Sequence, residues 1–511
     1  MKKLLFLITI ISCSCSSIQK QNAHLNDLIA VEKLQSDVDF TYKKLQKLQP
    51  KLYWYISKNE LDFKFDSLKK TITKPLTSFS FYKKISPVVC SVRQGHLYLY
   101  PQTIQLSKKE TKALTKKGVG PFSQFEFEIF DNKMFVVKNK SYNKKIEIGS
   151  EVISVNNFKI SNLIEEYKNY FTSDGYNTTF KKNRLARSFS NFFSNEHGIL
   201  DSLNYQFKRN DSVRNVLIKR QIVDSSAIKK TKVIVSKKDK KIKSKKDNLL
   251  GYEVTTKLYM RNLHFLEKDS SIAVIKINGF KIGNYEKCYD EFFKKIKKYK
   301  SRALILDFRN NGGGRLNEIS NLYSYLSDTT FIFVDKSEIT SKTSLLHADY
   351  FKGSNLLNFP IKLIASPFYY TYNFLKSKKY ADGKYYYSSN TKPKKIDENA
   401  FKGKIYVLIN GGSFSASSII SSNLKGSKRA TFVGEETGGG YNGTVAGRMP
   451  LIEMPYSKLK IRVGLMACIP FYKTNVEGRG IFPDQTILPN LKDRINEIDP
   501  EMNWVLEDLN K

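Results

Sequence analysis

The chain has 511 residues, which at about 150 residues per domain is too long for one compact domain and predicts three or four units. Hydrophobic residues make up 41% and charged residues 26%, values that exclude a wholly disordered or fibrous chain. The charge is unusual, because 86 basic and 48 acidic side chains leave a formal net charge of +38.

The basic residues are 71 Lys and only 15 Arg, whereas sequence-specific reading of nucleic acid depends largely on the Arg fork. The sequence also contains no helix-turn-helix, zinc-finger spacing or RNA-binding aromatic signature. We therefore expect no nucleic-acid partner. Solvated surface lysine is the simplest interpretation of the charge, and attraction to anionic surfaces or acidic substrates is the alternative.

The first residues indicate export. Two lysines precede a short apolar run at 4–11, which is too short to span a bilayer and fits a secretory signal. The run leads into Ile10-Ile11-Ser12-Cys13, which resembles the processing site of bacterial lipoproteins. This implies a signal peptide at residues 1–12 and acylation of Cys13. Cys15 is a weaker alternative, and an ordinary cleaved signal is the other interpretation.

No later stretch of the sequence reaches the ~20 apolar residues of a membrane helix. We therefore expect a lipoprotein of the bacterial cell envelope, facing the periplasm or on the outer surface, that is held to its membrane by lipid alone.

Cysteine and histidine are scarce. Beyond the signal only Cys90, Cys288 and Cys468 remain, which form neither a disulfide framework nor a metal cluster. The five histidines include no pair with the spacing of a zinc helix. We expect neither a metal nor an organic cofactor, and a general base must come from few candidates.

The hydrophobic pattern divides the chain into units. Residues 25–100 show helical apolar spacing, and residues 119–222 show short alternating strands with a turn at Gly149-Ser150. Residues 223–250 are dense in lysine and poor in apolar residues, which predicts an exposed linker or loop. A core at 251–490 and a C-terminal tail at 491–511 complete the division.

Continuous apolar runs alternate with amphipathic helices in the core. The expected strands are 272–277, 303–308, 405–409 and 431–433, and the expected helices are 284–299, 317–326 and 414–424. Such runs indicate a parallel sheet buried on both faces, with its active site at the carboxyl ends of the strands. The aromatic segment 366–400 is either an insertion over the cleft or a surface hairpin.

Two of these strand ends carry glycine and serine. The strand at 303–308 ends in Arg309-Asn310-Asn311-Gly312-Gly313-Gly314, where the backbone can approach a ligand and present N–H groups to a developing negative charge. The strand at 405–409 passes through Asn410-Gly411-Gly412-Ser413-Phe414-Ser415 directly into a helix, an arrangement that presents a serine hydroxyl at the positive end of the helix. The structural alternatives are a tight turn and a serine-rich helix cap.

Together the motifs resemble those of serine peptidases of the C-terminal processing peptidase (tail-specific protease) and tricorn core protease family. The matching pieces, in order, are D-F-R-N-N-G-G-G at 307–314, N-G-G-S-F-S-A-S at 410–417, V-G-E-E-T-G-G-G at 433–440 and V-E-G-R-G-I-F-P-D at 476–484. The resemblance covers most of residues 251–490. It implies an α/β catalytic core of ClpP/crotonase type, preceded by the N-terminal helical unit and by a PDZ-like β-rich module at 119–222.

The same resemblance implies the site residues. The nucleophile falls on Ser415, and the oxyanion hole on the backbone N–H groups of Gly313 and Ala416. The stretch 435–441 has no lysine where the lysine-dependent members place their base, so a Ser-Lys dyad is disfavoured. The tricorn-like branch uses Ser, His and Glu, which here fall on Ser415, His96 and Glu477. A structural histidine and a surface glutamate are the alternative interpretations of the last two.

We therefore predict a serine endopeptidase that hydrolyses peptides or unfolded proteins through an acyl-enzyme. The rival from another class is a catalytically inactive peptide- or ligand-binding lipoprotein on the same scaffold. A lysine-rich scaffold for anionic envelope polymers is a second rival.

Overall fold

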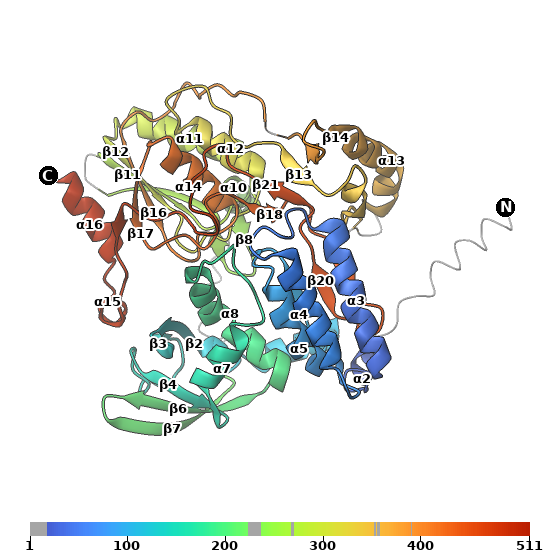
Figure 1. Ribbon diagram of the computed structural model, residues 1–511. Coiled ribbons are helices and arrows are strands. Elements are labelled where there is room, and N and C mark those ends of the chain that lie inside the picture. The colour runs from blue at the N-terminus through green and yellow to red at the C-terminus, as the bar shows by residue number, and fades with distance from the viewer. Residues whose placement is uncertain (1–17, 223–236, 267–269, 352–353, 355–357, 390) are drawn as a thin grey trace.

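The structure, a computed structural model, places the core sheet beside a helical N-terminal unit and a separate β-rich module (Figure 1). It describes residues 18–222, 237–266, 270–351, 354, 358–389 and 391–511. The signal segment and Cys13 lie outside the described residues.

A six-stranded sheet forms the centre of the core. Its spatial order is β10 (Arg261–Phe265), β11 (Ile272–Ile277), β12 (Ala303–Asp307), β16 (Lys404–Ile409), β17 (Thr431–Gly434) and β22 (Gln485–Thr486). Neighbouring strands are parallel except for β10, which is antiparallel to β11. The continuous apolar runs thus form the predicted parallel sheet.

Both faces of this sheet are buried, which explains why its strands read as unbroken apolar runs. One face packs into the main hydrophobic cluster with α11 (Tyr285–Lys298), α12 (Leu316–Ser324) and α14 (Ala416–Gly426). The other face forms a second cluster with α16 (Pro500–Leu509), in which Val505 is fully buried. Alternate residues of β11 serve the two clusters, as Val274 and Ile275 show.

A second sheet lies beside the core. Its order is β14 (Ser377–Lys379), β15 (Tyr385–Tyr387), β13 (Ser337–Ile339), β21 (Met466–Cys468) and β18 (Thr444–Ala446). The predicted insertion at 366–400 contributes the hairpin β14–β15, and it is preceded by the helix α13 (Asn358–Lys376). The short turn η2 (Ser344–His347) packs against α13.

The N-terminal unit is helical, and it is joined to the core. It consists of α2 (Ile18–Ala23), α3 (Val31–Leu48), α4 (Lys58–Lys70), α5 (Ser78–Cys90) and the strand β1 (Tyr98–Tyr100). Strand β1 pairs with β20 (Lys460–Arg462), which also pairs with β19 (Leu451–Glu453). The buried Asp37 of α3 accepts the N–H groups of Tyr456 and Ser457 at 3.2 and 2.6 Å. Segments more than 350 residues apart in the chain therefore form one small sheet.

The β-rich module forms a mixed unit of sheet and helix. Its antiparallel sheet has the order β2 (Phe125–Phe130), β3 (Lys133–Asn139), β4 (Glu151–Val155), β6 (Ser202–Arg209) and β7 (Ser212–Lys219), and β5 (Phe158–Lys159) pairs with β4. The helices α7 (Ile160–Tyr167) and α8 (Thr179–His197) lie between β5 and β6, while α6 (Lys108–Lys116) and η1 (Phe122–Gln124) precede the sheet.

The lysine-dense segment differs from the prediction of a linker or loop. Residues 223–236 lie outside the described residues, but α10 (Lys237–Leu250) is a helix that leads into the hairpin β8 (Tyr252–Glu253) and β9 (Leu258–Tyr259). The physical reason lies at the end of α10, where Leu250 is buried and the carbonyl of Asn248 accepts the N–H of Asn284 at 2.8 Å. Two leucines and this hydrogen bond dock a highly charged helix on α11.

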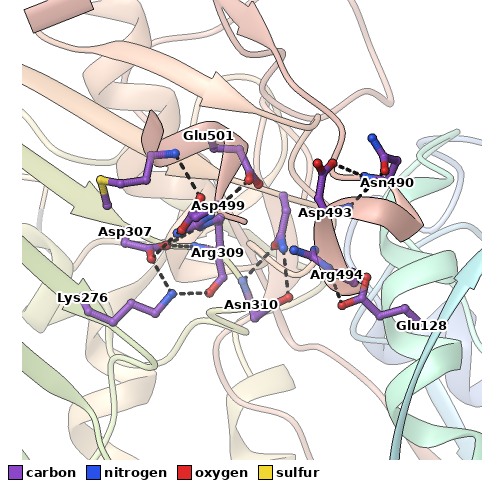
Figure 2. Close-up of polar contacts among 12 residues, drawn as sticks. Glu128, Lys276, Asp307, Arg309, Asn310, Asn490, Asp493, Arg494, Asp499 and Glu501 are labelled. Atoms are coloured by element: carbon purple, nitrogen blue, oxygen red, sulfur yellow. Dashed lines mark hydrogen bonds and ion pairs between the residues drawn. The ribbon is translucent and has the colours of Figure 1, made fainter. Parts of the chain in front are cut away.

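The predicted C-terminal tail is docked rather than free. It forms α15 (Leu491–Ile495) and α16, and Figure 2 shows its ion pairs. The Arg309 guanidinium donates to Asp307 at 3.0 and 2.9 Å and to Asp499 at 2.7 and 2.8 Å. Arg494 pairs with Glu128 of the β-rich module at 2.9 Å. The tail thus connects the end of β12 with the β-rich module.

Among the described residues, no helix combines the length and the apolar character that crossing a membrane requires.

Candidate active site

Ser415 occupies a strained turn between β16 and α14. Its backbone has φ +59° and ψ −117°, a conformation that residues other than glycine rarely adopt and that is found where a nucleophile is presented on a strand-to-helix turn. Ser415 is the residue before the first turn of α14, and its side chain makes no capping hydrogen bond. The hydroxyl is therefore free to meet another group.

The strain is held by hydrogen bonds between the two glycine-rich loops. The hydroxyl of Ser413 donates to the carbonyl of Phe308 at 2.8 Å, and the hydroxyl of Ser417 donates to the carbonyl of Asn311 at 2.8 Å. The N–H of Phe414 donates to the same Asn311 carbonyl at 3.0 Å. The hydroxyls of Ser413 and Ser417 thus have structural hydrogen-bond partners, and in this they differ from the hydroxyl of Ser415.

His96 reaches Ser415 from the N-terminal unit. Its Nε2 atom lies 2.9 Å from the Ser415 Oγ atom, although 319 residues separate the two in the sequence. The imidazole packs on the ring of Phe414 with a centroid distance of 4.9 Å, and Phe414 stacks on Phe180 at 4.3 Å. The loop that carries His96 lies between α5 and β1, so the pairing of β1 with β20 helps to place it.

The imidazole is neutral at ordinary pH. Burial, together with the positive charges of Arg462 and Arg184, lowers the pKa of His96 to about 3. Arg462 also donates from Nε to the His96 carbonyl at 3.0 Å. A neutral imidazole can accept a proton from a hydroxyl, which is what a general base for Ser415 requires.

Asp174 anchors the loop of His96, and the sequence analysis missed it. Its Oδ1 atom accepts the N–H of Gly95 at 2.8 Å and the hydroxyl of Thr444 at 3.1 Å, and its Oδ2 atom accepts the N–H of Gly440 at 3.3 Å. Burial raises the pKa of this carboxyl to about 6, although the three donors act in the opposite direction. The only local signal is the turn dipeptide Asp174-Gly175, which predicts a turn but no partner.

Glu477 is not in hydrogen-bond contact with His96 in the described part of the chain. Its exposed carboxylate accepts the indole N–H of Trp54 at 3.2 Å. The pKa of Tyr55 is raised mainly by burial, then by the charge of Asp174, and then by the charge of Glu477. Trp54 and Tyr55 stack with ring centroids 4.9 Å apart. Glu477, the predicted third member of the triad, thus contacts the aromatic pair of the N-terminal unit. The Trp54 indole competes with His96 for its carboxylate oxygen.

The two predicted oxyanion donors differ. Within the described residues, the N–H of Ala416 has no hydrogen-bond partner, as the first turn of a helix allows. The N–H of Gly313, by contrast, donates to the side-chain oxygen of Asn311 at 2.9 Å, so it is already engaged. Gly313 does lie at the site: its φ is +97°, and a methyl group there would come within 2.8 Å of Ser415 Cβ and of the Ala416 nitrogen.

The third and fourth motifs of the predicted set also meet. The Arg479 guanidinium donates to Glu436 at 3.0 and 2.6 Å, and the N–H of Gly480 donates to Glu436 at 2.7 Å. The hydroxyl of Thr437 accepts the N–H of Ile481 at 2.8 Å. Two segments 43 to 44 residues apart in the chain therefore meet at the buried Glu436 and Thr437.

The described residues contain no group of three or more His, Cys, Asp or Glu side chains suited to hold a metal ion. The cysteines at 90, 288 and 468 are free thiols.

A hydroxyl on a strained elbow, a neutral imidazole at hydrogen-bond distance and an open backbone N–H thus lie together, and serine hydrolases use such an arrangement to activate a nucleophile. The model of peptidase family S41 matches residues 271–487. This part of the chain is similar to peptidases of family S41.

The fold is similar to that of solved structures of CPAF. Mature CPAF complexed with lactacystin is 15% identical, with a TM-score of 0.57 over 94% of this chain and 97% of that chain. A CPAF mutant is 13% identical, with a TM-score of 0.60 over 91% of this chain and 95% of that chain. At these identities the similarity concerns the fold. No curated protein matches this chain.

Proposed function

We propose that this protein is an exported, lipid-anchored serine endopeptidase that cleaves peptides or unfolded protein segments in the cell envelope. The observation that supports the chemistry most directly is the distance of 2.9 Å between His96 Nε2 and Ser415 Oγ. Two residues from distant parts of the chain meet in a geometry that activates a serine.

In the proposed reaction, the Ser415 oxygen attacks the carbonyl carbon of the scissile bond while His96 Nε2 takes the hydroxyl proton. The tetrahedral oxyanion lies against the N–H of Ala416, and removing such a donor typically costs about 3 kcal/mol of transition-state stabilisation. The C–N bond then breaks, and His96 returns the proton to the leaving amine. Water, deprotonated by His96, hydrolyses the acyl-enzyme and regenerates Ser415.

A complete oxyanion hole requires a second donor. We propose that it is Gly313, whose N–H becomes available when the Asn311 side chain turns away. This movement frees a donor that already lies beside Ser415.

The third catalytic group of the proposal is Glu477. A neutral imidazole with a pKa of about 3 resists protonation, so a nearby negative charge is needed to stabilise the imidazolium that forms during attack. The Glu477 carboxylate supplies a charge on the loop that packs against the segment of Asp174, since Gly175 and Gly478 are in backbone contact.

The decisive test is labelling of the mature chain with a fluorophosphonate probe. We expect labelling of the wild type and none of Ser415→Ala. Ser418→Ala is the matched control, because Ser418 lies on the same helix and donates only to the Ser413 carbonyl at 3.2 Å. Equal labelling of wild type and Ser415→Ala would refute the nucleophile. Complete absence of labelling and of turnover in a correctly folded wild type would favour the inactive binding protein instead.

Endopeptidase activity and anchoring have their own tests. Incubation with an unfolded protein is expected to yield internal cleavage products by mass spectrometry, all absent in Ser415→Ala. Palmitate incorporation in a bacterial host is expected to be lost in Cys13→Ser and kept in Cys15→Ser. The PDZ-like character of the β-rich module and the ClpP/crotonase character of the core stay predictions.

A further inference from the structure

Helix α13 exposes an apolar stripe that nothing in the described structure covers. Five large apolar residues follow one another at helical spacings of 3, 4, 4 and 3 positions, so they lie on one face of the helix. All five are more than half exposed, with Ile364 at 74% and Phe368 at 78%. The stripe consists of Ile361, Ile364, Phe368, Tyr372 and Leu375.

The opposite side of α13 carries the buried residue of this helix and contacts the rest of the protein through aromatic groups. Asn373, the only buried residue of this helix, donates to the Tyr369 carbonyl at 2.8 Å. Tyr369 stacks on Tyr350 with a centroid distance of 4.1 Å, and Arg448 lies over its ring at 5.5 Å. The helix thus has its apolar face outward, the reverse of a helix that packs on a core. Contiguous exposed apolar surface of this kind marks an interaction site.

Lysines surround the stripe. Residues 358–384 contain five lysines and one acidic residue. Lys376 lies over the Tyr372 ring at 5.6 Å, and Lys342 lies over the Phe374 ring at 4.1 Å. Of these lysines, Lys384 pairs with Glu338 at 3.3 Å. In the described part of the chain, no ion pair involves Lys342, Lys376 or the exposed Lys378 and Lys379.

We propose that α13 lies flat on an anionic lipid bilayer, with its apolar stripe in the interface and these lysines at the level of the headgroups. An exposed apolar face bordered by cations is the pattern of helices that lie in a membrane surface, where lysine stems extend along the apolar layer and ammonium groups reach the phosphates. The inference is independent of the proposed peptidase chemistry.

The charge favours a bilayer over a second copy of this chain as the occupant. Two molecules with a formal net charge of +38 each repel one another, and pairing two copies of α13 would bring their unpaired lysines together. An anionic surface attracts the same lysines.

The position of α13 agrees with this orientation. Helices α2, α3 and α13 all lie on the right-hand side in Figure 1, so the first described helix and α13 share one side of the molecule in this view. The turn η2 connects them, because it packs on α13 while its His347 lies close to Lys44 and Lys47 of α3. A lipid on Cys13, five residues before α2, would hold this side toward the bilayer.

Vesicle binding tests the proposal without a lipid anchor. The chain from residue 13 onward, with Cys13→Ser, is sedimented with vesicles of phosphatidylglycerol and phosphatidylethanolamine, or of phosphatidylcholine alone. We expect the wild type to bind the anionic vesicles. The affinity should fall at least tenfold in the double variant Ile364→Ser with Phe368→Ser. It should fall about fivefold for each charge removed in Lys378→Gln with Lys379→Gln. Phe63→Ser is the matched control, since Phe63 on α4 is exposed to 71% and lies on another helix.

A tryptophan probe reports the depth of the helix directly. Phe368→Trp is expected to be quenched by brominated lipids in anionic vesicles, and Phe63→Trp is not. Unchanged fluorophosphonate labelling in the serine variants separates this result from loss of folding or of the proposed active site. Equal sedimentation of wild type and double variant, or no binding of the wild type, would overturn the proposal. A concentration-dependent dimer that Phe368→Ser converts to monomer would assign the stripe to a second copy instead.

Discussion

Asp174 offers the sharpest test of how His96 is held, because two substitutions divide its effects. Asp174→Ala removes the acceptor of three donors: the N–H groups of Gly95 and Gly440, and the hydroxyl of Thr444. Asp174→Asn keeps an oxygen for Gly95 and Thr444, and places an NH₂ group only against Gly440. The two variants therefore differ mainly in whether the loop of His96 keeps its anchor.

The expected change in the free energy of unfolding follows from two opposing contributions. Each buried donor that loses its acceptor costs about 1 to 3 kcal/mol. Against this, raising the pKa of Asp174 from 3.8 to about 6 means that the ionised carboxylate costs ~3 kcal/mol at neutral pH, a cost that either variant removes. We expect Asp174→Asn to be nearly as stable as the wild type at pH 7, and Asp174→Ala to be less stable than Asp174→Asn by about 3 kcal/mol.

The pH dependence has a definite sign. A carboxyl whose pKa is higher in the folded protein than in the unfolded chain holds its proton longer in the folded state, so its contribution to the free energy of unfolding falls as the pH rises from about 4 to about 6. Asp174→Asn lacks this titration. The difference in urea midpoint between wild type and Asp174→Asn should therefore shift in favour of the variant across that window and stay constant above it.

The assay for function is the rate of fluorophosphonate labelling at Ser415. We expect Asp174→Asn to retain at least a third of the wild-type rate and Asp174→Ala to lose at least tenfold, since a displaced imidazole no longer accepts the proton. Equal labelling rates in all three proteins would refute the anchoring role. A stability difference between wild type and Asp174→Asn that does not change between pH 4 and 6 would refute the buried charge.

Three further substitutions test the site itself. Arg462→Gln removes one of the positive charges that lower the pKa of His96, so the acidic limb of the pH profile of the labelling rate should move to higher pH. Arg462→Lys keeps the charge and should leave that limb in place. Identical pH profiles for the two variants would contradict this electrostatic role. Gly313→Ala adds a methyl group 2.8 Å from Ser415 Cβ at a φ of +97°, so the labelling rate should fall about 100-fold or more. A wild-type labelling rate in this variant would show that the loop of Gly313 is not where the structure places it. Glu477→Gln should lower kcat/KM on a peptide at least tenfold, and an unchanged value would remove this residue from the proposed triad.

The parallel sheet of the core could be predicted from the sequence, because the patterns that indicate it lie within short segments. Residues 272–275 and 405–409 are continuous apolar runs, and such runs between amphipathic helices have few solutions other than a buried parallel sheet. The elbow at Ser415 was also readable, since small residues must follow a strand that turns directly into a helix. The likeness of four ordered motifs then led to Ser415 as the proposed nucleophile.

The rest depends on contacts between distant segments. The charge of 223–250 obscured the two leucines that dock the end of α10, and the docked tail depends on the ion pair between Arg309 and Asp499. No pattern in the sequence predicts the partners of Asp174, because they belong to two other segments, at Gly95 and at 440–444. The hydrogen bond from Gly313 to Asn311 and the contact of Glu477 with Trp54 likewise arise from side-chain geometry that spacing does not encode.

The separation of His96 and Ser415 has a consequence for the timing of activity during synthesis. A ribosome completes the N-terminal unit long before it reaches α14, and the partner strand of β1 comes later still, at β20. A nascent chain, or a fragment cut anywhere between the two halves, carries a serine without its proton acceptor or a histidine without its hydroxyl. Under the proposed function, peptide cleavage therefore begins only after translation and folding are finished.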